Sequence, residues 1–269
     1  MPVRFLGLLV FFLVGAACTS EATPFPVDTP TVASGQLSSD QSVIRYALAP
    51  NTDGLVSDIN LLKNAAQVVQ LDTAIDPADL GSQFDIAAGY GDIPGGTRSP
   101  VTLHIVLVIN PTLLPWHDPN ILNIFRRSFD PEKITNALDI TGVSIESVTG
   151  KPTMDIQTQL ANAGWPDGLS FNLGNAYAPG SEQIIAQWKT ASIQAQQTIA
   201  PKSEIQADLI EGRFQAALVI WTTPDERGEL VSQFGNENVI DLYSLPISYL
   251  AVPELHISFT PGGWPLPTR

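Results

Sequence analysis

Three apolar segments decide the fold: Val43-Ile-Arg-Tyr-Ala-Leu-Ala49, then Val68-Val-Gln-Leu71, then Phe84-Asp-Ile-Ala-Ala-Gly-Tyr90. Residues 53–66, between the first two, place apolar side chains at helical spacing, and Asp76-Pro77 marks a second helix start before the third. Strands that alternate with helices are typical of a parallel sheet, because parallel neighbours need a crossover between them. The sequence therefore predicts an α/β fold.

Beyond this unit runs a nearly continuous apolar stretch, Val101-Thr-Leu-His-Ile-Val-Leu-Val-Ile109, which predicts a strand buried on both faces. Further helices are expected after Asp118-Pro119 and Asp130-Pro131 and at 154–163 and 184–195, and further strands at 169–173 and 214–221. Residues 260–267 are rich in Pro and Gly, and we expect no regular structure there.

The N-terminus has the features of a signal peptide. Arg4 supplies a positive charge, Phe5 to Val14 is apolar or glycine, and small residues stand directly before Cys18, the one cysteine of the chain. The segment resembles a bacterial lipobox, although Gly15 stands where Leu is usual. We expect Cys18 to be lipid-modified and to anchor the protein at the outer face of the cytoplasmic membrane or in the periplasm. The alternative is an ordinary secretory signal that happens to carry a cysteine.

Composition excludes several classes of function. The net charge is −14, which argues against nucleic-acid partners and against electrostatic docking on anionic lipid, so a lipid anchor is the one membrane contact expected. Residues 19–42 are dominated by Thr, Ser and Pro, as in a flexible tether. With a single cysteine the chain forms no internal disulfide, so stability must come from the core.

A search for catalytic chemistry finds no convincing set of residues. The three histidines, His104, His117 and His256, do not share a metal-binding spacing. The sequence has neither a nucleophile elbow nor a complete phosphate-binding loop. We therefore expect no catalytic residues, no metal and no cofactor, and hence a protein that is not an enzyme.

From residue 84 to residue 221, five segments resemble the extracellular solute-binding proteins of the peptide/nickel type of ABC importer. In order they are Phe84–Gly89, Val108–Asp118, Asn123–Ile134, Gln159–Gly168 and Leu209–Trp221. The third contains Arg-Arg-Ser-Phe-Asp-Pro, the fourth Ala-Gly-Trp-Pro-Asp-Gly, and the last Gly-Arg-Phe followed by Gln215, where the family commonly has Asp. The order of the pieces carries the resemblance. Members of the family are usually about twice as long, so this chain looks like a reduced version.

The resemblance implies a two-lobed, periplasmic-binding-protein-like (type II) α/β fold with a hinge between the lobes. The expected division is 1–17 signal peptide, 18–42 lipid-anchored linker, 43–99 with 222–269 first lobe, and 100–221 second lobe. A monomer would hold a small solute, such as a short peptide, between the lobes and deliver it to an ABC permease. The alternative is a lipoprotein that keeps the binding fold but acts as a sensor or scaffold.

The candidate ligand contacts follow from the strand ends, because clefts in α/β folds lie at the carboxyl ends of strands. The residues at or shortly after the ends of predicted strands are Asn51, Tyr90, Asp92, Asn110 and Trp221. None of them is basic, so we expect a neutral or cationic solute, held in part by aromatic faces.

Overall fold

Strands β1 (Arg45–Leu48), β2 (Gln67–Gln70) and β3 (Ile86–Tyr90) form the parallel unit predicted from the first segments, in the order β2–β1–β3. The computed structural model describes residues 43–269 except 57, 139 and 147–154. The predicted signal peptide, Cys18 and the tether therefore lie outside the described residues. The helix expected at 53–66 is a short 3-10 turn, η1 (Asp53–Leu55), followed by α1 (Ile59–Ala65). Asp76 caps a second turn, η2 (Pro77–Asp79), through the backbone N–H of Ala78.

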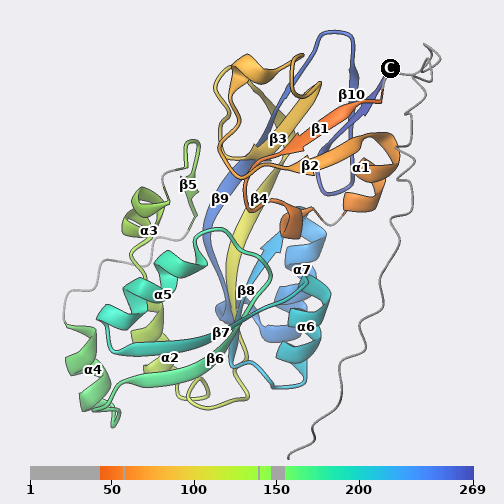
Figure 1. Cartoon of the computed structure of the whole chain (residues 1–269). Coiled ribbons are helices and arrows are strands. Elements are labelled where there is room, and N and C mark those ends of the chain that lie inside the picture. Colours follow the sequence, from red (N-terminus) through yellow and green to blue (C-terminus); the bar gives the residue numbers. More distant parts are fainter. Residues whose placement is uncertain (1–42, 57, 139, 147–154) are drawn as a thin grey trace, which may run out of the picture. The chain divides into compact units, whose positions relative to one another are not determined.

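Two long antiparallel strands connect this unit to the rest of the fold. These crossing strands are β4 (Thr97–Ile109) and β9 (Val239–Ala251), of 13 residues each. The strand order is β2–β1–β3–β9–β4–β8–β6–β7, with β5 (Ser144–Ile145) on β9, so a single hydrogen-bonded path runs through the whole sheet. Figure 1 shows β4 in yellow and β9 in blue running together between the two groups of strands. The crossing strands therefore occupy the place of a hinge.

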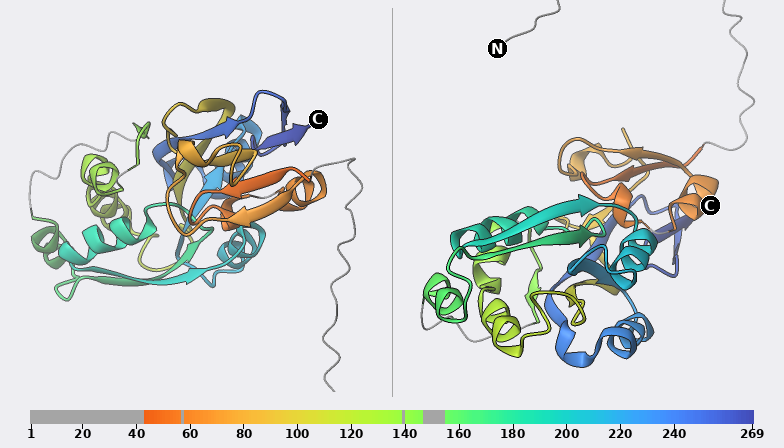
Figure 2. Two further views of the ribbon diagram at one scale, coloured as in Figure 1. Left: turned by 45° about the horizontal axis from the view of Figure 1, so that its top comes forward. Right: turned by 90° about the horizontal axis from the view of Figure 1, so that it is seen from below.

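A second parallel group is built on β6 (Leu169–Asn175), β7 (Ile193–Ile199) and β8 (Ala216–Trp221). Its helices are α2 (Pro119–Arg127), α3 (Pro131–Ala137), α4 (Ile156–Asn162), α5 (Ser181–Thr190), α6 (Lys202–Ile210) and α7 (Pro224–Phe234), followed by the turn η3 (Asn236–Asn238). Both views of Figure 2 keep the orange β1 and β2 apart from the green helices of this group. The helix expected at 184–195 ends at Thr190, and Ala195 lies in β7 instead.

The core of the second group contains an aromatic cluster of Trp116, Phe125, Phe129, Phe171 and Trp188. The opposite face of β4 and β8 packs with Leu230 and Phe234 of α7. Because α7 packs with the second group, a division into lobes has its return crossing at β9 rather than directly after residue 221. We call β1–β3 with α1 the first lobe, and β6–β8 with α2–α7 the second lobe.

The C-terminal tail is regular, contrary to the expectation from its Pro and Gly content. Strands β10 (His256–Phe259) and β11 (Pro265–Thr268) form an antiparallel hairpin. Its prolines are tolerated because the hairpin has two strands only, so each strand leaves one edge without a ladder partner. Trp264 is 1% exposed, which anchors the hairpin in the core. In the part of the chain that the structure describes, no helix is both long enough and apolar enough to cross a bilayer.

Candidate functional site

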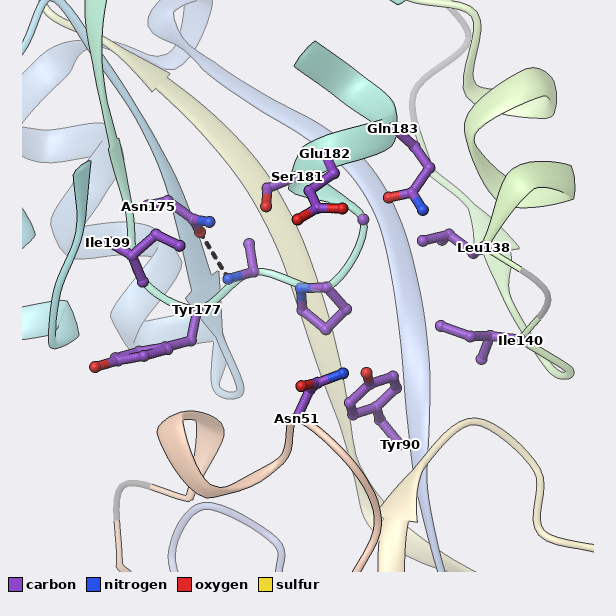
Figure 3. A pocket seen from close by; sticks show the side chains of 13 residues that line it. Asn51, Tyr90, Leu138, Ile140, Asn175, Tyr177, Ser181, Glu182, Gln183 and Ile199 are labelled. Atoms are coloured by element: carbon purple, nitrogen blue, oxygen red, sulfur yellow. Dashed lines mark hydrogen bonds between the residues drawn. The ribbon is translucent and has the colours of Figure 1, made fainter. Parts of the chain in front are cut away.

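The candidate site is a cleft formed by two adjoining pockets of about 510 and 360 Å³. The two pockets share Asn51, Tyr90 and Ile140. Their walls come from the ends of β1 and β3 in the first lobe, from the loop between β6 and α5 in the second, and from the segment before β5. Figure 3 shows the first-lobe residues Asn51 and Tyr90 facing that loop. The cleft thus lies at the carboxyl ends of parallel strands, where the topology predicts it.

Asn51 and Tyr90 are the two predicted residues that line both pockets. Asn51 lies in the turn after β1 and has a φ of 58°, a left-handed conformation that Asn tolerates better than most residues. Tyr90 ends β3 and is half-buried, and this burial raises the pKa of its hydroxyl. The hydroxyl is therefore protonated at neutral pH and can donate a hydrogen bond into the cleft.

Asp92 lines the second pocket, but its carboxylate is already engaged. Arg98 donates to both oxygens, at 2.6 and 2.7 Å, and this ion pair lowers the pKa of Asp92. The backbone carbonyl of Asp92 accepts from the hydroxyl of Thr141. Asp92 therefore ties the turn after β3 to β4 and to the segment before β5, and contributes little free negative charge to a ligand.

The loop from Asn175 to Ser181 forms the second-lobe wall and contains none of the residues predicted from the sequence. Asn175 is 2% exposed, and its Oδ1 accepts from the N–H of Ala178 at 2.8 Å (Figure 3). Tyr243 of β9 donates to the carbonyl of Pro179, and burial raises the pKa of Tyr243, which keeps this donor protonated. The strand-exit argument would have found the loop, but the predicted strand ended at Leu173, two residues before β6 ends.

Asn110 does not lie in the cleft, and this corrects the prediction. Its side chain is buried, donates to the carbonyl of Leu209 at 2.8 Å and accepts from the N–H and hydroxyl of Thr112. The reason is strand direction. Because β4 is antiparallel to β8, the carboxyl end of β4 lies beside the start of β8, where Asn110 N–H donates to Gln215. The strand-exit rule applies to parallel strands, and β4 runs the other way.

Trp221 also lies outside both pockets. Its indole stacks on the ring of His104, with centroids 3.7 Å apart and planes at 2°. Trp221 pairs with His104, whereas the next pair, Ile105 with Tyr243, points to the opposite face. Tyr243 reaches the cleft loop, so Trp221 lies on the far face of the crossing strands.

Charge around Trp221 is paired within the protein. The Nε1 of Trp221 donates to Asp241 at 3.3 Å, and Arg227 binds the same carboxylate at 2.6 Å. The Nδ1 of His104 lies 2.7 Å from Oε1 of Glu146. Among the described residues, no group of three or more His, Cys, Asp or Glu could hold a metal ion.

The side chains that line the cleft carry a weak net negative charge. Glu182 lines the larger pocket, and no ion-pair partner for it is found among the described residues. Asp92, the acid of the smaller pocket, is neutralised by Arg98. Neither pocket is lined by a lysine or arginine from the described part of the chain. Amide groups of Asn51, Asn175 and Gln183 offer further polar contacts, beside the hydroxyls of Tyr90, Tyr177 and Ser181.

Comparison with known proteins places this geometry in a fold family. No protein-family model and no curated protein sequence matches the chain. Among solved structures, it is similar to a dipeptide-binding protein from Pseudoalteromonas sp. SM9913 in complex with Met-Leu, at 12% identity and a TM-score of 0.50. It is also similar to a substrate-binding protein from Microbacterium hydrocarbonoxydans complexed with 4-hydroxybenzoate hydrazide, at 10% identity and a TM-score of 0.50. The chain has the two-lobed periplasmic-binding-protein fold.

The structural match covers most of this chain but only part of the two similar proteins. It covers 79% of this chain and 55% of the dipeptide-binding protein, and 75% and 58% in the second case. The chain therefore spans about half the length of these proteins.

Proposed function

We propose that this protein is an extracytoplasmic solute-binding lipoprotein of an ABC transporter. It captures a small neutral or cationic solute, with short peptides among the candidates, between its two lobes. The observation that carries the proposal is the cleft itself, which is lined by Asn51 and Tyr90 from one lobe and by Asn175 and Tyr177 from the other. A ligand between them would contact both lobes, and the crossing strands beside it form a hinge.

The chemistry of the walls supports a ligand without strong negative charge. A polyanion would require Arg or Lys at the site to offset its desolvation, and neither pocket offers one from the described residues. Glu182 and the aromatic faces of Tyr90 and Tyr177 instead favour a cation. The larger pocket, at about 510 Å³, is within the range of roughly 300–1,000 Å³ typical of small-molecule sites.

A thermal-shift screen of amines, sugars, short peptides and polyanions tests the proposal, with calorimetry on each hit. Tyr90→Ala is expected to weaken binding at least about tenfold, because a desolvated aromatic anchor contributes roughly 2 kcal/mol. Tyr90→Phe keeps the ring and should bind within a few-fold of the native protein. Hits confined to polyanions, or equal binding by Tyr90→Ala, would contradict the proposed site.

One alternative function belongs to a different class. A lipoprotein that keeps the binding fold could act as a sensor or a scaffold without serving a permease. Permease and ATPase genes next to the gene for this chain would support transport. A neighbouring sensor kinase gene, or an isolated gene, would support the alternative.

A further inference from the structure

The ring of Tyr177 in the second lobe packs directly against Gly54 in the first lobe. A Cβ atom built on Gly54 would lie 2.4, 2.5 and 2.8 Å from Cδ1, Cγ and Cε1 of the Tyr177 ring. Ordinary van der Waals contact is 3.4–4 Å, so the ring occupies the space that any side chain at position 54 would need. Figure 3 shows Tyr177 at one side of the pocket and Leu138 with Ile140 at the other.

The requirement for glycine at position 54 comes from this contact alone. Gly54 does not adopt a positive φ, so its backbone would accept an L-residue without strain. The three nearest atoms to the built Cβ all belong to the Tyr177 ring. The backbone position of Gly54 is also fixed by its neighbours. Gly54 lies in η1, and the preceding Thr52 is fully buried and donates from its hydroxyl to the carbonyl of Ala49.

The conformation of Tyr177 is costly and is imposed by its surroundings. Its φ is 56°, which is uncommon for a bulky residue, and its side chain is 39% exposed. The hydrogen bond from Ala178 N–H to Asn175 and the one from Tyr243 to Pro179 hold the loop on both sides of it. Strained residues that are held in this way cluster at ligand clamps and switch regions.

This loop is also joined to the hinge. Tyr243 belongs to the crossing strand β9 and reaches Pro179, two residues from Tyr177. A movement of the second lobe about the crossing strands would therefore carry the ring toward or away from Gly54. The ring contacts a glycine of the first lobe, which has no side chain to keep it at a distance.

We propose that Tyr177 is a positioning residue whose ring docks on Gly54 to hold the two lobes closed and to seal one side of the cleft. The value of closure rests on the proposed solute-binding function, but the contact can be tested on the ligand-free protein. A failure of the proposed contact between Tyr177 and Gly54 can therefore be told apart from a failure of the proposed solute-binding function.

The test measures the distance between the lobes by electron-spin resonance on the full chain with Cys18→Ser. Spin labels are placed at Leu61→Cys in α1 and Ile210→Cys in α6, both exposed. Gly54→Ala is expected to shift the main distance to a longer value, because the ring must retreat from 2.4 Å to at least 3.4 Å from the new Cβ. Gly228→Ala in α7, with no atom within 4 Å, is the matched control and should leave the distance unchanged.

Ring removal provides the decisive second arm. Tyr177→Asn deletes the ring but tolerates the left-handed φ, and it should broaden the distance distribution. In that background Gly54→Ala should have no further effect, whereas Tyr177→Phe should keep the native distance. An unchanged distance in Gly54→Ala, or an equal effect of Gly54→Ala with and without the ring, would overturn the proposal.

Discussion

The rings of His104 and Trp221 stack face to face on the crossing strands, 3.7 Å apart and nearly parallel. The pair joins β4 to β8, and Asp241 adds β9 through the Nε1 of Trp221. Three central strands therefore meet in one contact, on the face opposite Tyr243. This arrangement favours a packing role for Trp221 on the crossing strands, outside both pockets.

Trp221→Ala should accordingly lower stability without changing affinity. The lost stacking and burial are expected to lower the free energy of unfolding by about 1–3 kcal/mol, less than for a fully buried Trp because the indole is partly exposed. Binding of a solute identified by the screen should change less than about twofold, since distant sites act independently. Urea unfolding and calorimetry measure the two quantities. A tenfold loss of affinity with no loss of stability would instead indicate that Trp221 contacts the ligand.

Asp85 gives the first lobe an acid-sensitive component of stability. Hydrogen bonds from the Arg45 side chain, the shortest at 2.7 Å, lower the pKa of Asp85 below its ordinary value. A depressed carboxyl pKa contributes stability that is present above the unfolded pKa of about 3.9 and is lost as pH falls through the folded value. Asp85→Asn should therefore cost about 1 kcal/mol at pH 7, discounted because Arg45 is partly exposed.

The measurement for Asp85 is urea unfolding of both proteins from pH 7 to pH 2. The difference between the native protein and Asp85→Asn should shrink as pH falls below about 4. A difference that is independent of pH would show that the carboxylate charge does not contribute.

Trp264 should make the C-terminal hairpin essential for stability. It is 1% exposed, and the backbone N–H of Gly262, two residues before it, donates to Asp58 just before α1. Trp264→Ala is expected to cost about 3–5 kcal/mol, as for other buried Trp residues. His256→Ala, at an exposed position of β10, should stay within about 0.5 kcal/mol of the native protein. Comparable urea midpoints for the two variants would mean that the hairpin is dispensable.

Strand direction and side-chain alternation decide which of the predicted site residues line the cleft. Asn51 and Tyr90 could be predicted because β1 and β3 are parallel strands with clear ends. Asn110 could not be placed correctly from the sequence, because nothing local shows that β4 runs antiparallel to its neighbours. Tyr177 was missed because Gly174 and Asn175 obscure where β6 ends.

Elsewhere, predictions from the sequence are wrong where local patterns compete. The edge strand β7, Ile193-Gln-Ala-Gln-Gln-Thr-Ile199, has no strong apolar alternation, and Ala191 and Ala195 extend the helical spacing of α5 into it. The hairpin at the C-terminus depends on long-range burial of Trp264, which outweighs the turn propensity of its Pro and Gly residues. The apolar strand at 101–109 was predictable because burial on both faces leaves a continuous apolar run.

Cys18→Ala tests the proposed lipid anchor. The substitution removes the thiol to which lipid would be attached, so the protein should move from the membrane fraction to the soluble fraction. Mass spectrometry of the mature native N-terminus should find a lipid-modified Cys18. A variant that stays wholly with membranes would place the anchor elsewhere.

Glu182→Gln tests the preference for cations directly. Glu182 lies in the first turn of α5 at the larger pocket. Loss of its charge should weaken a cationic hit from the screen about threefold to fivefold, equivalent to roughly 0.7–1 kcal/mol for a partly exposed charge pair, and leave a neutral hit unchanged. The effect should diminish at high salt, because ions screen exposed charges. Glu204→Gln, in the first turn of α6 and outside both pockets, is the matched control. An equal loss for cationic and neutral compounds would indicate that Glu182 shapes the loop rather than selecting charge.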